Sequence, residues 1–207
     1  MRRGSAQGLE AIELSAKAQL QQQQVAAVEA QLAEAGATLA RGRTALVERL
    51  SVALEAVPES PFARPALAYS PGGPLDAPAL AAELARGRER DRAAQRTLTG
   101  PHRDDLMVTM AGKAMPAAAC STGEQKAMLI AITLAHAELA AAGRPGLLLL
   151  DEVAAHLDPL RREALFERLR AGNAQVWLTG TEPAPFAAIA DEAAVWRVAA
   201  GAVERLS

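Results

Sequence analysis

Between about Leu9 and Val57, apolar residues recur at intervals of three, four or seven positions in a background rich in Ala, Gln, Glu and Leu. Only Gly36 and Gly42 interrupt this region. The periodicity predicts one or two long amphipathic helices. The heptad spacing is not strict, which favours an ordinary packed helix over the alternative of a protruding coiled-coil arm. The recurring positions include Ile12, Val25, Val28, Leu32, Leu39, Leu46 and Leu50.

A proline-rich segment between Pro58 and Pro78 follows, and with the pair Gly72-Gly73 it interrupts regular structure. A short strand near Ala66–Tyr69 is expected inside it. Helical patterning then resumes over Ala79–Ala94, where arginines and acidic residues are mixed. Such a face is usually only solvated, and contact with DNA backbone phosphates is the alternative. The arginines concerned are Arg86, Arg88, Arg90 and Arg92.

From about residue 97 onward, short apolar runs, loops and helical segments alternate. Alternation of strands with helices predicts the α/β class with a mainly parallel sheet. The last two apolar runs, Ala194–Val198 and Val203–Leu206, flank Ala200-Gly201 and predict a terminal β-hairpin. We therefore expect a helical arm with its proline-rich connector at residues 1–78, and an α/β portion at residues 79–207.

Composition narrows the possible functions. Half of the 207 residues are apolar, which allows a buried core, and the net charge of −2 provides no global basic field for nucleic acid. Only three Phe, two Trp and one Tyr are present, which disfavours a base-stacking platform. The single cysteine, Cys120, excludes an internal disulfide, and three scattered histidines do not predict a zinc site. No apolar run reaches about 18 residues, so we expect a cytoplasmic protein without membrane contact.

The first segment with chemical potential is Ser121-Thr122-Gly123-Glu124-Gln125, which directly precedes the apolar, helix-like run Ala127–Leu139. A polar turn that opens a helix leaves the first backbone N–H groups without carbonyl partners, and these groups can bind a phosphate. A Ser followed three residues later by Glu is also an ordinary capping box. The motif alone favours the capping box.

The second segment is a run of four leucines, Leu147–Leu150, after Pro145-Gly146. It predicts a strand buried on both faces of a sheet. Asp151 and Glu152 follow directly, at the strand end where open α/β sheets bind their ligands. This arrangement is typical of a Walker B segment. Asp151 would hold Mg²⁺ through its water shell, and Glu152 would act as general base toward the attacking water.

The third segment is Leu157-Asp158-Pro159, in which Asp158 is expected to cap a helix that runs to about Arg170. A Leu-Asp pair in this position forms the D-loop of ABC-type ATPases. Asp151 lies 28 residues after Gly123, which leaves room for one helix, a turn and a short strand. Signature loop, Walker B strand and D-loop therefore occur in the order that an ABC-type ATPase requires.

A fourth segment makes the resemblance specific. Gly100-Pro101-His102-Arg103-Asp104-Asp105-Leu106 resembles a signature of the RecF family. The resemblance covers about residues 79–207 closely, and the helical arm more loosely. It implies an ATP-dependent, DNA-binding protein of gap repair, DNA replication and the SOS response, which works with mediators that load the RecA recombinase. It also implies a head-to-head homodimer with ATP sandwiched between two heads.

The resemblance also implies roles for individual residues. Ser121 and the Gly123 backbone would contact the γ-phosphate of the nucleotide bound by the partner protomer, whereas Asp151 and Glu152 would serve the nucleotide bound in cis. His102 and Arg103 are either active-site residues or structural residues at a strand end. The remaining residues assigned to the nucleotide site are Thr122, Glu124, Gln125 and Asp158.

Two departures from the family matter. The phosphate loop Gly-x-x-x-x-Gly-Lys-Ser/Thr is absent, because the only Gly-Lys pair, Gly112-Lys113, lacks the required neighbours. The strand Gln175–Thr179 is followed by Gly180-Thr181 rather than by a histidine, so Thr179 or Thr181 has either a weaker γ-phosphate role or a turn role. We expect poor affinity for ATP and no turnover by the chain alone. The alternatives are a non-catalytic fragment that binds DNA or a partner, and a fragment of another SMC-like ATPase.

Overall fold

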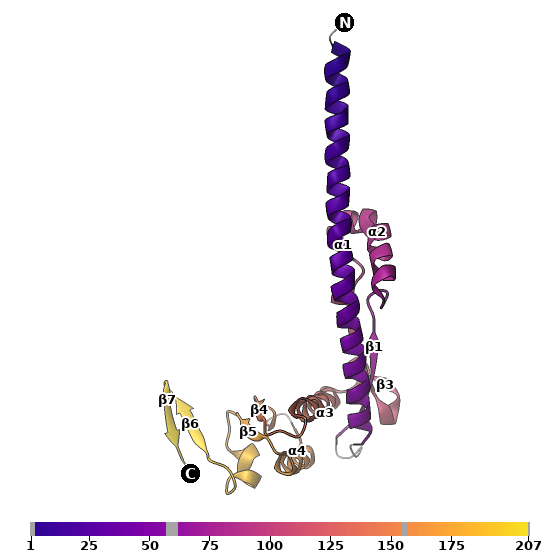
Figure 1. Ribbon diagram of the computed structural model, residues 1–207. Helices are drawn as coiled ribbons and strands as arrows, with labels where there is room; N and C mark the ends of the chain where they lie inside the picture. Colours follow the sequence, from indigo (N-terminus) through magenta and orange to yellow (C-terminus); the bar gives the residue numbers. More distant parts are fainter. Residues whose placement is uncertain (1–2, 57–61, 155–156, 207) are drawn as a thin grey trace. The chain divides into compact units, whose positions relative to one another are not determined.

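The computed structural model of the chain describes residues 3–56, 62–154 and 157–206, with side chains from Leu14 onward (Figure 1). The described residues form two compact units. Unit one comprises residues within 1–48 and 68–107, and unit two comprises residues within 49–67 and 108–207. The helices are α1 (Arg3–Glu55), α2 (Ala77–Ala94), α3 (Thr122–Ala141) and α4 (Pro159–Ala171). The strands are β1 (Pro65–Ser70), β2 (Asp105–Met110), β3 (Met115–Pro116), β4 (Leu147–Leu150), β5 (Gln175–Leu178), β6 (Trp196–Ala199) and β7 (Ala202–Arg205).

The strands form three small sheets. β1, β2 and β3 are neighbours in this order, with β2 and β3 antiparallel. β4 and β5 form a parallel pair, and β6 and β7 form the predicted antiparallel hairpin. The hairpin turn uses positive φ at both central residues, Ala200 at 48° and Gly201 at 77°, which matches the twist of a two-residue hairpin. The predicted strand near residue 66, the helix of residues 79–94 and the alternation after residue 97 are all present.

In unit one, α1 is a single continuous helix that packs beside α2 (Figure 1). Its buried residues there are small, with Ala33, Ala37 and Ala40 each at most 5% exposed. Leu80 and Leu84 of α2 pack against Ala33. Small side chains on α1 therefore allow the close approach of α2. The bulky positions that recur in the sequence are mostly exposed instead, namely Val25, Val28, Leu32, Leu39 and Leu46.

The core of unit two lies between α3, α4 and the β4–β5 pair. Leu165 and Phe166 of α4 are almost fully buried in it, and Leu148 packs on the same cluster. Leu147 and Leu149, by contrast, are 61% and 68% exposed. The expectation that β4 is buried on both faces is therefore wrong for the described residues, because α3 and α4 cover one face only. Trp177 of β5, opposite Leu149 in the register, is also exposed on the uncovered face.

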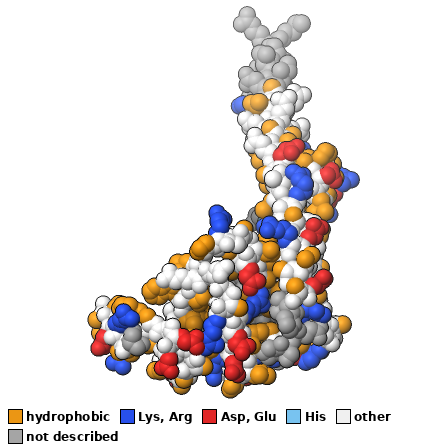
Figure 2. All heavy atoms as spheres, turned by 60° about the horizontal axis from the view of Figure 1, so that its bottom comes forward, with side chains coloured by type: hydrophobic (Ala, Val, Ile, Leu, Met, Phe, Trp, Pro, Cys, Tyr) orange, Lys and Arg blue, Asp and Glu red, His pale blue; other side chains and the backbone are white. Residues whose placement is uncertain are grey.

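No helix among the described residues is long and apolar enough to cross a membrane. On the face that Figure 2 presents, basic and acidic side chains are interspersed with apolar ones. This agrees with the near-neutral net charge of −2. Any contact with a polyanion therefore depends on local groups of arginines rather than on a general field.

Candidate nucleotide site

The parallel pairing of β4 with β5 places the ends of the two strands side by side. The register runs from Leu147 opposite Gln175 to Leu150 opposite Leu178. The Thr179 N–H then donates to the Leu150 carbonyl across 3.1 Å. As a result, Asp151 and Thr179, the first residues after their strands, lie together at the carboxyl edge of the sheet. Open α/β sheets bind ligands at this edge.

Three groups meet at that edge. The Thr179 hydroxyl donates a hydrogen bond to Asp151 Oδ1, and the Glu152 N–H donates to Thr179 Oγ1 across 3.3 Å. Glu152 has a φ of 54°, in the left-handed region that non-glycine residues seldom adopt. The chain therefore turns sharply directly after Asp151. Thr179, which the sequence left with two possible roles, is the residue that joins the two carboxylate positions.

The Asp151 carboxylate is the kind of oxygen donor that a magnesium ion shared with a nucleotide takes. Mg²⁺ in phosphate-transfer sites keeps several waters and takes one or two carboxylates together with phosphate oxygens. Among the described residues there is no group of three or more His, Cys, Asp or Glu that could hold a metal by itself.

The segment Ser121–Gln125, which the sequence predicts to be a signature loop, opens α3 with a complete capping box. Ser121 is the N-cap, and the Glu124 N–H donates to its hydroxyl oxygen across 3.4 Å. In return, Glu124 Oε2 accepts from the N–H and the hydroxyl of Ser121, each at 2.9 Å. The capping role considered in the sequence is therefore confirmed. Gln125 adds a bond from Nε2 to the Cys120 carbonyl across 3.0 Å, which holds the preceding residue of the loop.

Lys113 is a neighbour of the signature loop that the sequence did not reveal. Its Nζ donates to Glu124 Oε1 across 2.5 Å. This bond, followed by those from Ser121, lowers the pKa of Glu124 to about 2, and Glu124 in turn raises the pKa of Lys113. From the sequence, Gly112-Lys113 was considered only as a Gly-Lys pair that lacks the other residues of a phosphate loop. Its contact with a residue eleven positions away depends on the turn between β2 and β3.

The start of α4 lies beside the signature loop. Asp158 caps α4 by accepting the Arg161 N–H across 2.9 Å, as predicted, and its second oxygen accepts from Arg161 Nη1 across 2.8 Å. The backbone bond from Arg161 contributes most to lowering the pKa of Asp158. The same Arg161 Nη1 lies 3.9 Å from the position that a Cβ at Gly123 would take. Asp158, Arg161 and the loop at Gly123 thus form a second cluster, beside the exposed residue Thr122.

The four arginines of α2 are all paired with carboxylates. Arg88 makes two bonds to Glu29 of α1, at 2.7 and 2.6 Å, in a partly buried position, and this pairing raises the pKa of Arg88. Arg86 and Arg90 share Glu83, and Arg92 pairs with Glu89, with all three guanidinium side chains more than 60% exposed. Arg88 therefore connects two helices, whereas the other three make surface pairs that cost little to exchange.

The segment Gly100–Leu106 lies around a buried carboxylate in unit one. The side chain of Asp104 is 6% exposed. It accepts bonds from Arg43 Nη1 at 2.5 Å, Tyr69 Oη at 2.6 Å and the Gly72 N–H at 2.8 Å. His102 Nε2 lies 2.8 Å from the Thr97 carbonyl oxygen. The contacts of this motif thus organise the turn that precedes β2, and the sequence did not single out Asp104 as their centre.

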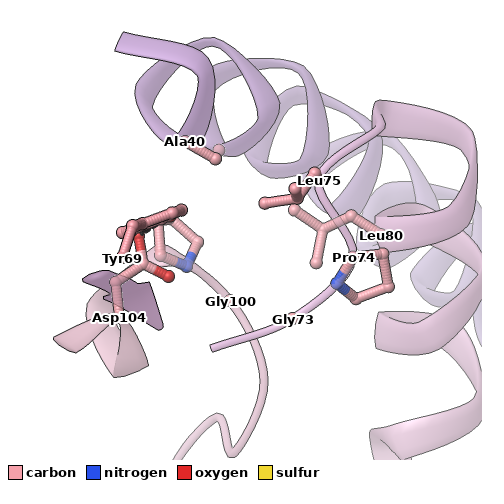
Figure 3. Close-up of a pocket in the computed structure, with 10 residues that line it drawn as sticks. Ala40, Tyr69, Gly73, Pro74, Leu75, Leu80, Gly100 and Asp104 are labelled. Atoms are coloured by element: carbon pink, nitrogen blue, oxygen red, sulfur yellow. Dashed lines mark hydrogen bonds between the residues drawn. The ribbon is translucent and has the colours of Figure 1, made fainter. Parts of the chain in front are cut away.

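Tyr69 and Asp104 face each other at one end of a small cavity of about 10 Å³, and Leu75 and Leu80 lie at its other end (Figure 3). This volume is comparable to that needed for one water molecule. Burial raises the pKa of Asp104, but the bonds from Tyr69, Gly72 and Arg43 outweigh it and hold that pKa below its usual value. Burial, followed by the bond to Asp104, raises the pKa of Tyr69 to about 12.

These features define a class of protein. An α/β fold with a capped signature helix, a strand ending in Asp151 and Glu152, and a capped helix at Asp158 has the order of the second part of an ABC-type ATPase head. Solved structures agree with this fold. The recombination mediator protein RecF with ATP in the RecFOR pathway superposes with a TM-score of 0.69 at 20% identity, over 89% of this chain and 51% of that one. The corresponding RecF-ATPrS structure gives 0.71, also at 20% identity and with the same coverage.

Curated relatives to which this chain is similar are RecF proteins. The DNA replication and repair protein RecF of Mesorhizobium japonicum is 46% identical over 191 residues, which are 86% of this chain and 50% of that protein. RecF of Brucella abortus strain 2308 is 46% identical over 189 residues, or 84% of this chain and 49% of the relative. The chain thus spans about half the length of the curated relatives that it matches. The resemblance to RecF predicted from its sequence is confirmed over that half. No family model matches the chain.

Proposed function

We propose that the chain forms part of an ATP-dependent, DNA-binding protein of DNA repair and replication, and that it supplies the signature loop, the Walker B carboxylates and the D-loop. One observation carries the proposal. Asp151 and Glu152 are joined through Thr179 at the carboxyl edge of a parallel strand pair. The names of the relatives, which describe DNA replication and repair proteins, support the same biological role.

The two residue clusters are suited to two different nucleotides. Asp151 would hold Mg²⁺ through its water shell, and Glu152 would take a proton from the attacking water of the nucleotide bound in cis. A bound Mg²⁺ supplies charge that stabilises the transferring phosphoryl group. At the start of α3, the backbone N–H groups at Thr122 and Gly123 suit the γ-phosphate of a nucleotide bound by a partner protomer, and the Ser121 hydroxyl would join them by exchanging its bond to Glu124. This arrangement requires a head-to-head homodimer.

DNA contact is assigned to the exposed arginines of α2. Arg86, Arg90 and Arg92 form surface ion pairs, and DNA phosphates can replace the carboxylates of such pairs at little cost. We assign backbone contacts to these residues, in gapped DNA or at a junction of single and double strands. Mediator proteins that load the RecA recombinase are the proposed protein partners. The scarcity of aromatic residues agrees with backbone contacts rather than base stacking.

The test measures Mg²⁺-dependent ATP turnover by the chain alone and by the chain mixed with a complementing segment. We define the complementing segment as the part of the Mesorhizobium japonicum RecF protein outside the 191 matched residues. We expect that segment to contribute the phosphate loop, so the chain alone should show no turnover and the mixture should show it. Glu152→Gln should abolish the turnover, while Glu163→Gln, an exposed acid on α4, should leave it unchanged.

Turnover by the chain alone that disappears on Glu152→Gln would contradict the proposed division of the site between the two polypeptides. A mixture that forms a complex but never hydrolyses ATP would contradict the enzymatic proposal itself. It would instead support a fragment that binds DNA or a partner without catalysis.

A further inference from the structure

Thr179 occupies a position that its sequence context did not explain. Its single hydroxyl has two partners, because it donates to Asp151 Oδ1 and accepts the Glu152 N–H across 3.3 Å. The backbone N–H of Thr179 is bonded to the Leu150 carbonyl, so the residue is also fixed to the end of β4 through its backbone. One side chain from β5 therefore holds both residues that follow β4.

The exposure of these groups indicates what the hydroxyl does. Thr179 and Asp151 are both exposed, so water could satisfy their polar atoms if the bond were absent. A hydrogen bond at an exposed position adds little to the stability of a fold. Its main effect is directional, because it fixes Asp151 Oδ1 and leaves the other carboxylate oxygen in a defined orientation.

The backbone conformation of Glu152 also depends on the Thr179 hydroxyl. Its φ of 54° is unfavourable for a residue with a side chain, and such a conformation persists where surrounding contacts hold it. The Glu152 N–H bond to Thr179 Oγ1 is one such contact. The direction in which the Glu152 side chain leaves the turn therefore depends on the Thr179 hydroxyl.

We infer that Thr179 is a positioning residue of the ATPase site, which orients Asp151 toward a nucleotide-bound divalent cation and holds the turn that presents Glu152. This inference rests on the proposed function. Thr179 acts through the two carboxylate residues and need not touch the nucleotide. This positioning role differs from the γ-phosphate contact and from the turn role that the sequence offered for Thr179 or Thr181.

The first test uses the chain itself. Hydrogen exchange of the Glu152 amide, followed by NMR, is compared among wild type, Thr179→Val and Thr179→Ser. Valine keeps the branched shape without the hydroxyl, whereas serine keeps the hydroxyl without the methyl group. We expect exchange about tenfold faster in Thr179→Val and within about twofold of wild type in Thr179→Ser. The midpoint of thermal unfolding should change by less than about 2 °C in either variant, because the site is exposed.

The second test uses the chain together with the complementing segment. Thr179→Val should lower kcat, or raise the Mg²⁺ concentration for half-maximal turnover, by about 10- to 100-fold, as expected when a group that orients a metal ligand is removed. The KM for ATP should change by less than about twofold, because the phosphate loop provides most ground-state contacts. Thr179→Ser should restore turnover. The control is Thr133→Val, whose hydroxyl is bonded to the Leu129 carbonyl within α3.

Each outcome separates the inference from the proposed function. If the wild-type mixture hydrolyses ATP and Thr179→Val does so equally well, the inference is wrong and the proposed function stands. The inference also fails if Thr179→Ser does not restore the loss, if Thr181→Val rather than Thr179→Val causes it, or if the Glu152 amide exchanges at an unchanged rate in Thr179→Val. A wild-type mixture that forms a complex without turnover overturns the enzymatic proposal, whereas the exchange rate of the Glu152 amide in the chain alone shows separately whether the Thr179 hydroxyl holds the turn.

Discussion

Tyr69 donates a hydrogen bond to the nearly buried carboxylate of Asp104 across 2.6 Å. The same carboxylate oxygen accepts from Arg43 Nη1 at 2.5 Å, and Arg43 Nη1 also donates to the Pro101 carbonyl across 2.6 Å. Asp104 thus connects α1, β1 and the turn that leads into β2, within the motif that made the RecF resemblance specific. We conclude that stabilising unit one is the main role of this aspartate.

Asp104→Asn should therefore destabilise the chain. The substitution removes the charge from three hydrogen bonds while keeping the side-chain size, and we expect a loss of about 2 kcal/mol in the free energy of unfolding. Tyr69→Phe removes one bond only and should cost about 1 kcal/mol. Urea unfolding followed by circular dichroism measures both. Asp105→Asn, an exposed neighbour, is the control, and equal effects of Asp104→Asn and Asp105→Asn would contradict this role.

The pKa values of the same pair predict how stability depends on pH. The pKa of Asp104 is lowered by folding, so its contribution is present above the ordinary aspartate pKa and is lost as the pH falls through the folded value. The pKa of Tyr69 is raised to about 12, so its contribution is present below about pH 10 and is lost between about pH 10 and 12.

Urea unfolding at a series of pH values gives a curve of stability against pH. Asp104 should shape its acidic arm, and Tyr69 should shape its alkaline arm. Asp104→Asn should flatten the acidic arm, and Tyr69→Phe should flatten the alkaline arm. An alkaline arm that is unchanged in Tyr69→Phe would show that another group causes it.

Gly72 is a position where a side chain should not fit. A Cβ there would lie 2.4 Å from Arg103 Cβ and 2.6 Å from the Gly100 carbonyl oxygen. Gly72→Ala should therefore lower the free energy of unfolding by about 2 kcal/mol or more, because backbone has to move. Gly42→Ala in α1 is the matched control. Nothing lies within 4 Å of its Cβ position, so alanine should stabilise the helix by about 0.5–1 kcal/mol. Equal tolerance at both sites would contradict this packing.

The arginines of α2 should separate into two kinds. Arg88→Ala should lower the free energy of unfolding more than alanine at Arg86, Arg90 or Arg92 does, because it leaves Glu29, which is 15% exposed, without its partner. Alanine at Arg86, Arg90 and Arg92 together should leave stability almost unchanged. The triple substitution should weaken DNA binding. It should also reduce the slope of log affinity against log salt concentration by about one for each phosphate that is no longer bound. Binding of gapped DNA at several salt concentrations measures this, and an unchanged slope would contradict the assignment.

Much of the fold follows from local sequence signals. The caps at Ser121 and Asp158 and the turn at Ala200-Gly201 were predicted because capping and turn formation depend on neighbouring residues. Burial was predicted less well. The alanines of α1 are buried and Leu147 is exposed, because burial depends on which elements pack together rather than on the size of an apolar side chain.

In the candidate site, too, features that depend on neighbouring residues were predicted, and contacts between distant residues were not. The position of Asp151 and Glu152 at the carboxyl end of a strand could be predicted because strand and charge signals coincide in one short segment. The hydrogen bond of Thr179 with Asp151 joins residues 28 positions apart, and that of Arg43 with Asp104 joins residues 61 apart. Such contacts are fixed by strand pairing and helix packing, which a local pattern does not encode. The ion pair of Lys113 with Glu124 was not predicted for the same reason, since it depends on the position of Lys113 beside Glu124 in the fold.

In the proposed dimer, the signature loop and the Walker B carboxylates of one chain serve different nucleotides. ATP turnover by a mixture of two inactive variants, Ser121→Arg and Glu152→Gln, each combined with the complementing segment, tests it most directly. In a symmetric dimer with sites shared between protomers, half of the randomly mixed dimers contain one intact site, so turnover should recover to about one quarter of the wild-type rate. If both elements served the same nucleotide, every site would carry a defect. The mixture would then remain as inactive as either variant alone, which would contradict the account.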